Sequence, residues 1–374
     1  MTVIDADQHI LEPRTMWADH MPAGERARAL AIEDDELGNA WLTWNGERIV
    51  LADVTTPGDV DRVGRRLQRA LRGESPEARY DDELTPVMWD PDARVDALGA
   101  LGVDEAVLFP NFGLSWERVL ENDLDATRAN MAAWNRWAAQ LAGPRLHPVA
   151  HLTLRDADWL RGQLAELEAA GIRLAMISPG LVNGRRLSHP DHDAIWAAFI
   201  EHGITPSFHV ANVTPAFDDA WLASEPHPGN SVMGSVFLWS GAALAIADLT
   251  LNGVFERHPD LRLGAFELSA VWLPLFLQYL DGGYRFHRKL HGESIVDLPM
   301  PPSAYVKRHV RVAAFAYEQP QMLTPGCGDM FMACSDFPHS EGTATPVTDY
   351  AQANLTPDTA PGLFADNLSW LLRR

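Results

Sequence analysis

The chain has 374 residues, 47% of them hydrophobic, so it is long enough to bury the core of one large α/β domain. Its 51 acidic and 30 basic side chains give a net charge of −21, which opposes binding to nucleic acid or to an anionic membrane. With two cysteines and no recognisable cleavable leader, we expect a protein of the reducing cytoplasm without a disulfide framework.

Eight short apolar segments recur along the chain, and each has the composition of a buried strand. They lie at residues 3–7, 105–109, 147–153, 172–178, 204–210, 261–267, 310–315 and 330–335. Helical patterns separate them, for example at 126–142 and 159–170. Strands that alternate with helices favour a closed (β/α)8 barrel over a doubly wound sheet. We therefore predict one TIM-barrel domain over residues 1–374, with an insertion after strand 1.

The predicted insertion covers about residues 23–82. In it, Asn45-Gly46 joins the segments 40–44 and 47–51, and this dipeptide favours a hairpin because both residues tolerate positive φ angles. An arginine-rich stretch at 61–79 follows. Because the active site of a TIM barrel forms at the C-terminal ends of its strands, we expect this hairpin and helical segment to act as a lid. A packing excursion without a catalytic role is the alternative.

Two later stretches are strongly apolar. Residues 231–247 carry no charge and fall short of the ~20 apolar residues that span a bilayer, so we interpret them as a buried helix. Residues 271–276, with the sequence VWLPLF, are expected to bury an interface between two copies of the chain. We therefore expect a homodimer and no membrane-spanning segment.

Potential metal ligands stand where the predicted strands end. The C-terminal ends of all strands in a parallel barrel meet on one face, so distant residues can surround one point. Asp7 and His9 lie two apart and so project to the same side of strand 1. The residues predicted to bind metal are Asp7, His9, Glu12, His209, Glu267, Asp336 and His339. Three of them, Glu12, Glu267 and His339, are also our candidates for catalytic proton transfer.

Four motifs in a fixed order resemble the amidohydrolase family 2 group of TIM-barrel metal-dependent enzymes. They are IDADQHILEP at 4–13, SHPDHDAIW at 188–196, FELSAVWLP at 266–274 and SDFPHSEG at 335–342. That family contains hydrolases and nonoxidative aromatic decarboxylases. The resemblance implies a small-molecule substrate and ligands from the ends of barrel strands 1, 5, 6 and 8.

The chain departs from the commonest pattern of that family. It has Asp7-Gln8-His9 where many members have His-x-His, and Glu267 where a histidine often ends strand 6. Strand 4 ends in Ile177-Ser178-Pro179, which offers no bridging carboxylated lysine. Such an oxygen-rich ligand set suits iron or manganese, whereas structural zinc sites prefer cysteine and histidine ligands.

The Asp-x-His-x-x-Glu-Pro opening, with a glutamate after strand 6, is most similar to the subgroup that contains the nonheme diiron monooxygenase of platensimycin and platencin biosynthesis. This resemblance implies two irons that react with O2, an electron donor, and hydroxylation of a bulky, terpenoid-like acid as its coenzyme A thioester. The arginines at 62, 65, 66, 69 and 72 are then candidates to meet the coenzyme A phosphates. The alternative is a redox-neutral hydrolase or nonoxidative decarboxylase with one zinc or manganese ion.

Overall fold

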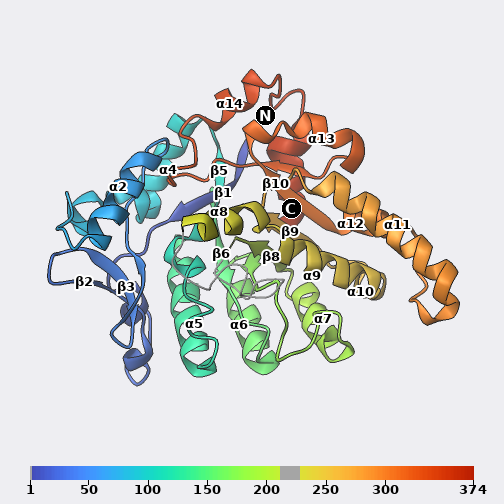
Figure 1. Cartoon of the computed structure of the whole chain (residues 1–374), viewed down its shortest axis with the longest axis horizontal. Coiled ribbons are helices and arrows are strands. Elements are labelled where there is room, and N and C mark those ends of the chain that lie inside the picture. Colours follow the sequence, from blue (N-terminus) through green and yellow to red (C-terminus); the bar gives the residue numbers. More distant parts are fainter. Residues whose placement is uncertain (1, 211–227) are drawn as a thin grey trace.

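The computed structural model describes residues 2–210 and 228–374, and its centre is a barrel of eight parallel strands (Figure 1). Neighbouring strands follow chain order around the barrel. The strands are β1 (Ile4–Ile10), β5 (Glu105–Pro110), β6 (Leu146–His151), β7 (Leu174–Met176), β8 (Thr205–His209), β9 (Leu263–Phe266), β10 (Val310–Ala314) and β11 (Phe331–Ala333). Each coincides with a predicted strand to within a few residues. The prediction of a (β/α)8 TIM barrel is confirmed.

Helices surround the barrel and cover the outer face of its strands, so the strands are buried on both sides (Figure 1). The longer ones are α4 (Pro91–Leu101), α5 (Leu124–Leu141), α6 (Ala157–Ala169), α7 (Asp193–Glu201), α9 (Ser240–Leu251), α11 (Leu273–His291), α12 (Pro302–His309) and α13 (Pro320–Cys327). Asp90, Asp123 and Asp156 cap the first turns of α4, α5 and α6 by accepting hydrogen bonds from backbone N–H groups. An aspartate therefore caps the N-terminus of each of these three helices.

The junction between β1 and β11, where the barrel closes, depends on few backbone hydrogen bonds. The His9 N–H donates to Phe337 O at 2.7 Å, and the Asp336 N–H donates to Asp7 O at 2.8 Å. Both strands at this junction carry predicted metal ligands. The contacts that close the barrel therefore also bring Asp7, His9 and Asp336 together.

A buried carboxylate, Asp5, stabilises this closing junction. It accepts hydrogen bonds from Ser335 N at 2.9 Å, Ser335 Oγ at 2.5 Å and Gln8 Nε2 at 2.8 Å. Arg94, also buried, donates to Gln8 Oε1 at 3.0 Å and to His9 O at 2.8 Å. Burial raises the pKa of Asp5 to about 6, although the hydrogen bonds that Asp5 accepts from Ser335 and Gln8 favour its charged form.

The predicted insertion forms a small antiparallel sheet with a helix beside it, at the left of Figure 1. The strands are β2 (Ala31–Asp34), β3 (Ala40–Trp44) and β4 (Glu47–Leu51), and the helices are α2 (Val60–Leu71) and α3 (Tyr80–Glu83). Asn45 and Gly46 have φ angles of 51° and 79°, so the predicted hairpin turn is confirmed. The strand β2 was not predicted. A role as a lid stays a prediction.

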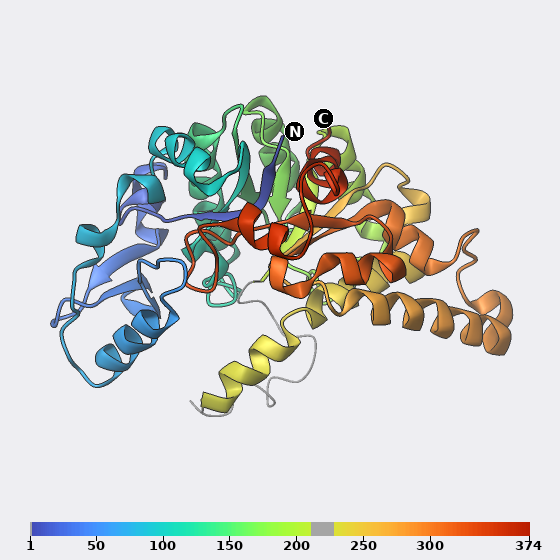
Figure 2. The same cartoon turned by 90° about the horizontal axis from the view of Figure 1, so that it is seen from above.

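Residues 231–247 do not form the single buried helix that we predicted. They divide between α8 (Pro228–Phe237) and α9, and Figure 2 shows α8 projecting from the body. The side chains of Val232 and Val236 are 64% and 56% exposed. By length and composition, Val232–Leu251 is apolar enough to cross a membrane, although only 28% of its most apolar window is buried here. The prediction was wrong for α8 because an uncharged sequence does not distinguish a core helix from one that presents apolar groups outward.

We expect the substitution Asp5→Ala to lower the free energy of unfolding by about 2–4 kcal/mol. The substitution leaves the buried donors of Ser335 and Gln8 without an acceptor, and each unpaired buried donor costs roughly 1–3 kcal/mol. Urea titration followed by circular dichroism measures this loss. The control is Asp158→Asn, whose side chain is 97% exposed and which should change stability by less than about 0.5 kcal/mol. Equal effects of the two substitutions would contradict the role of Asp5.

Candidate metal centre

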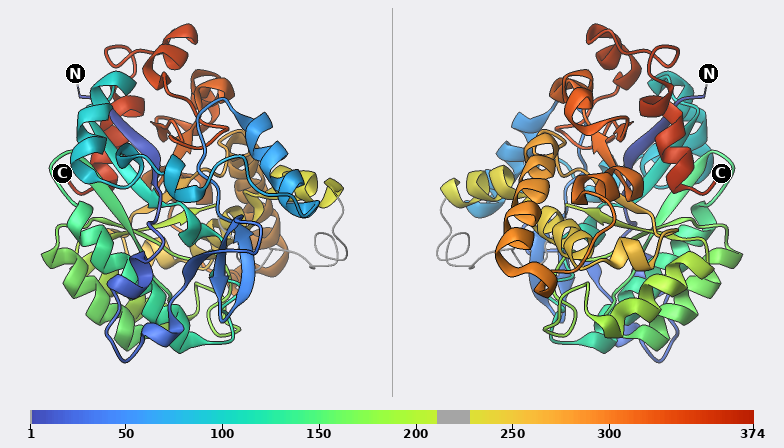
Figure 3. Two further views of the ribbon diagram at one scale, coloured as in Figure 1. Left: turned by 90° about the vertical axis from the view of Figure 1, so that its left-hand side faces the viewer. Right: turned by 90° about the vertical axis from the view of Figure 1, so that its right-hand side faces the viewer.

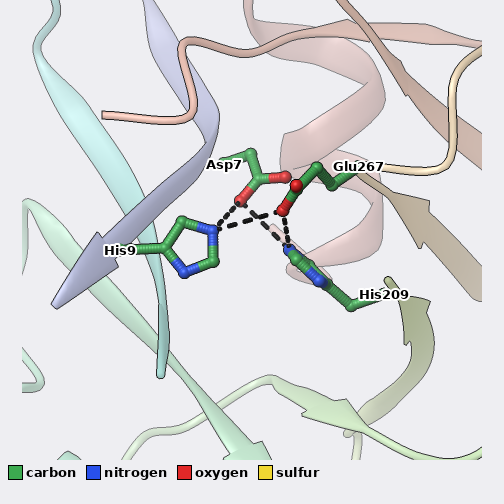
Figure 4. Close-up of side chains that lie close together, drawn as sticks. All are labelled: Asp7, His9, His209 and Glu267. Atoms are coloured by element: carbon green, nitrogen blue, oxygen red, sulfur yellow. Dashed lines mark hydrogen bonds and ion pairs between the residues drawn. The ribbon is translucent and has the colours of Figure 1, made fainter. Parts of the chain in front are cut away.

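Four predicted ligands converge on one space at the C-terminal ends of three strands (Figure 4). Asp7 and His9 belong to β1, His209 ends β8, and Glu267 follows β9. His9 Nε2 lies 3.5 Å from both Asp7 Oδ1 and Glu267 Oε2. His209 Nε2 lies 3.4 Å from the same two oxygens. The four ligand atoms, one from each residue, lie within 4.8 Å of one another, which is close enough for a single ion to reach all of them.

A second group overlaps the first and contains Asp336 and His339. Asp336 Oδ1 lies 3.2 Å from His9 Nε2 and 2.7 Å from His339 Nδ1. The His339 ring stacks on His9 with 3.9 Å between centroids, and His339 Nε2 lies 2.7 Å from Asn111 Oδ1. His9 and Glu267 are common to both groups. Six of the seven predicted ligands are therefore brought together.

The structure does not bring Glu12 into either group. Its carboxylate accepts hydrogen bonds from the backbone N–H groups of Phe112 and Gly113 at 3.0–3.1 Å. Burial raises the pKa of Glu12 to about 7, against the effect of these hydrogen bonds. In this position Glu12 ties the end of β1 to the loop after β5.

Several ligand atoms are buried without a hydrogen-bond partner among the described residues. They include Asp7 Oδ2, His9 Nε2 and Glu267 Oε2. Buried polar atoms are normally paired, because leaving them unpaired costs free energy. The Nδ1 atoms of His9 and His209 face the carbonyl oxygens of Pro110 and Val210, so each carries a proton and leaves Nε2 free for an ion. The donor set therefore fits a divalent cation.

The electrostatics of the cluster are also those of a cation site. Burial, and then the neighbouring Asp336, raise the pKa of Asp7 to about 8, although His9 and His339 oppose the shift. Burial and Asp336 raise the pKa of Glu267 as well. Burial lowers the pKa of His209 to about 4, so its imidazole is neutral near pH 7. Without a cation, the Asp7 carboxyl holds a proton at pH 7 that a cation would displace.

The backbone beside the site is held in unusual conformations. Glu267, Ser269 and Asp336 have φ angles of 48°, 59° and 57°, which non-glycine residues rarely adopt. Such conformations persist where surrounding contacts fix them, and Glu318 supplies these contacts next to Glu267. Its buried carboxylate accepts hydrogen bonds from Ser269 Oγ and, at 2.9 Å each, from the N–H groups of Ala270 and Phe315.

Our sequence reasoning missed Glu318 and Asn111. Both are polar residues that follow a barrel strand, Asn111 just after β5 and Glu318 a short turn after β10. A search of all strand ends for polar side chains, rather than for metal ligands alone, would have found them. Nothing in the sequence shows which neighbour each of them contacts.

The chain matches no protein-family model and no curated protein sequence. It is similar in structure to an amidohydrolase from Mycobacterium avium subsp. paratuberculosis, with a TM-score of 0.79, 22% identity and 99% of each chain covered. It is also similar to 5-carboxyvanillate decarboxylase from Novosphingobium aromaticivorans with bound manganese, at a TM-score of 0.67, 18% identity and coverage of 100% and 97%. For 2,6-dihydroxybenzoate decarboxylase from Rhizobium these values are 0.63, 13%, 100% and 99%. At these identities the likeness establishes the fold.

The prediction of a diiron monooxygenase is wrong. The similar structures named above are an amidohydrolase and two decarboxylases, not oxygenases, and the 5-carboxyvanillate decarboxylase carries manganese. The expected irons, O2, electron donor and coenzyme A thioester therefore have no support. A carboxylate-rich ligand set was insufficient evidence for redox chemistry, because the same hard oxygen ligands also suit manganese.

The arginines assigned to coenzyme A mostly have partners within the insertion. Arg66 is buried and forms ion pairs with Asp53 and Glu83, and Arg62 also pairs with Glu83. Arg69 donates to Ser75 O at 2.9 Å. Arg72 lies 2.7 Å from a carboxylate oxygen of Glu74. Arg65 is exposed and has no partner among the described residues. The four paired arginines thus make their contacts within the insertion and its flanking helix.

We expect Mn²⁺ binding to the metal-free protein to release at least one proton per ion at pH 7. The pKa of Asp7 is raised to about 8, so this carboxyl is protonated below that pH and must lose its proton to bind. Affinity should rise from pH 6 to pH 9 and then level off. Isothermal titration calorimetry in two buffers of different ionisation enthalpy counts the released protons. Binding without proton release at pH 7 would contradict this assignment.

Proposed function

We propose that this chain is a redox-neutral enzyme that uses one divalent cation to decarboxylate a small aromatic carboxylic acid. The observation that carries the proposal is the convergence of buried carboxylates and imidazoles on one space, with ligand atoms left unpaired. The manganese in a structurally similar 5-carboxyvanillate decarboxylase supports it. The substrate class comes from the two similar decarboxylases, both of which are named for aromatic acids.

In this proposal Asp7, His9, His209 and Glu267 hold the cation, and the chain offers two oxygen and two nitrogen ligands. Manganese suits such a mixed set, and zinc is the alternative. When bound, the ion would attract the substrate carboxylate and offset its charge. The barrel interior supports the ligands from below, since the Phe109 ring lies 4.2 Å from that of His209 and 5.1 Å from that of Phe266.

In this proposal Asp336 and His339 transfer the proton that decarboxylation requires. The bond between the ring carbon and the carboxylate breaks, its electron pair stays on the ring carbon, and CO2 leaves while that carbon takes up a proton. The 2.7 Å contact between Asp336 Oδ1 and His339 Nδ1 holds a proton beside the cation ligands. Asn111 fixes the far side of the His339 ring.

Hydrolysis is the second candidate, and the similarity to an amidohydrolase at a TM-score of 0.79 favours it. In that case the Asp336–His339 pair would take a proton from the attacking water. The two reactions give different products. Decarboxylation releases CO2 without incorporating solvent oxygen, whereas hydrolysis in H2¹⁸O labels the product.

We expect chelation to abolish turnover of 5-carboxyvanillate or 2,6-dihydroxybenzoate, and Mn²⁺ to restore it. His209→Ala should lose the cation, because the ion loses one of four ligands. His339→Gln should keep the cation but lower kcat by about 10²–10⁴-fold, since it removes the proton carrier. Metal content by mass spectrometry and CO2 release measure these effects. The control is His189→Gln, a partly exposed histidine in the turn that precedes α7 and outside the cluster of candidate ligands.

The assignment of roles fails if His339→Gln loses the cation as His209→Ala does, or if it leaves kcat unchanged. The decarboxylase proposal fails if the Mn²⁺-loaded protein consumes aromatic acids with ¹⁸O incorporation and no CO2. Oxygen consumption would not be expected in any case.

A further inference from the structure

The helix α11 presents an apolar stripe to the outside of the molecule. It runs along the outer edge of the fold and faces the viewer in the right-hand view of Figure 3. Four large apolar side chains on this helix are exposed: Leu275 by 60%, Tyr279 by 72%, Phe286 by 61% and Leu290 by 60%. Single apolar residues scattered over a surface are normal, but several on one face of one helix indicate an interaction site.

The four residues share one face of the helix and are arranged symmetrically. Their spacings of four, seven and four residues correspond to the seam of an antiparallel helix pair. The midpoint of the row falls between Gly282 and Gly283. A Cβ added at either glycine would have no atom within 4 Å, so the middle of the stripe is open to close approach.

A groove of about 490 Å³ borders this stripe. Tyr279, Gly283 and Tyr284 of α11 form one wall, and Leu251 of α9 and Val296 form part of the rest. The surface thus has a ridge of exposed apolar side chains beside an apolar groove. In a pair of identical surfaces, the ridge of each copy can pack into the groove of the other, which a flat surface would not allow.

The charge of the stripe distinguishes it from the rest of the chain. The whole protein has a net charge of −21, so two copies repel each other over most approaches. Residues 271–296 contain two acidic residues, Asp281 and Glu293, against three basic ones, Arg285, Arg288 and Lys289. This segment is therefore less acidic than the chain as a whole and repels a second copy less.

The exposed apolar area of the stripe is that of a small interface, at the low end of the range for specific complexes. Stable interfaces cover roughly 800 Å² per partner, and a buried aromatic side chain contributes roughly 150–250 Å². Tyr279 and Phe286 expose most of their side chains, and Val271 is 57% exposed beside them. With Leu275, Leu290 and the groove wall, the stripe reaches the order of several hundred Å².

We propose that α11 pairs with α11 of a second copy, antiparallel, about a two-fold axis at Gly282–Gly283. In this arrangement Leu275 packs against Leu290 of the second copy and Tyr279 against Phe286 of the second copy. Antiparallel packing also sets the positive end of each helix dipole beside the negative end of its mate. The pairing is independent of the proposed reaction.

The first test is the mass of the full-length protein in solution. Sedimentation velocity at micromolar concentration should give twice the chain mass of 41.4 kDa. The double variant Tyr279→Glu/Phe286→Glu should sediment as a monomer, with the dissociation constant raised at least 100-fold. Both positions are exposed, so the fold should survive, and circular dichroism checks this. The matched control is Leu71→Glu on α2, whose residue is 67% exposed and lies outside the stripe.

The second test is cross-linking, which reports orientation. Gly283→Cys should form a disulfide-linked dimer on oxidation, because the two copies of residue 283 lie next to the axis. Leu290→Cys should not, because its two copies would be separated by about 22 Å along the helices, at 1.5 Å per residue, and a disulfide needs Cα atoms within about 7 Å. The native cysteines, Cys327 and Cys334, are buried and should not interfere.

Three results would overturn the proposal. One is a wild-type monomer at all accessible concentrations, including one that binds anionic vesicles, which would make the stripe a membrane contact. Another is a dimer that survives Tyr279→Glu/Phe286→Glu, which would place the interface elsewhere. The last is Leu290→Cys cross-linking as readily as Gly283→Cys, which would exclude the antiparallel register.

Discussion

The structure depends on one electrostatic constraint, the burial of several carboxylates around a single point. Oxygen atoms of Asp7, Glu267 and Asp336 all lie 3.2–3.5 Å from His9 Nε2, and the side chains of Asp7 and Asp336 are fully buried. Like charges buried together are unstable unless protons or a cation balance them. The junction of β1 and β11 adds a second requirement, because the strands that carry Asp7, His9 and Asp336 meet there through few backbone hydrogen bonds. Asp5 and Arg94 stabilise the junction, and through it they hold the ligands in register.

This constraint explains why ligand identity alone was a poor guide to the reaction. Carboxylates and imidazoles define the charge and the geometry of a cation site, and both iron and manganese accept such ligands. Whether the site performs redox chemistry depends on the ion, on access for O2 and on an electron donor, none of which is encoded by the spacing of Asp7, His9 and Glu12. The comparison with amidohydrolases and decarboxylases therefore carried information that the motif did not.

The sequence was sufficient to predict the barrel because each strand has a local apolar signature, and it predicted the convergence of six ligands because parallel strands end on one face. Beyond a strand end, side-chain direction is set by loops that are remote in sequence. Glu12 shows this, since its carboxylate turns to the amides of Phe112 and Gly113. The exposure of α8 was missed for a related reason, because hydropathy reports composition and not the presence of a neighbour.

The insertion contacts the loop that carries His339. Thr55 Oγ1 donates to Pro338 O at 3.0 Å, and the Gly58 N–H donates to Ser340 O at 2.9 Å, one on each side of His339. The insertion is therefore mechanically coupled to the histidine that we assign to proton transfer. A displacement of residues 55–58 would therefore be transmitted to the backbone on both sides of His339.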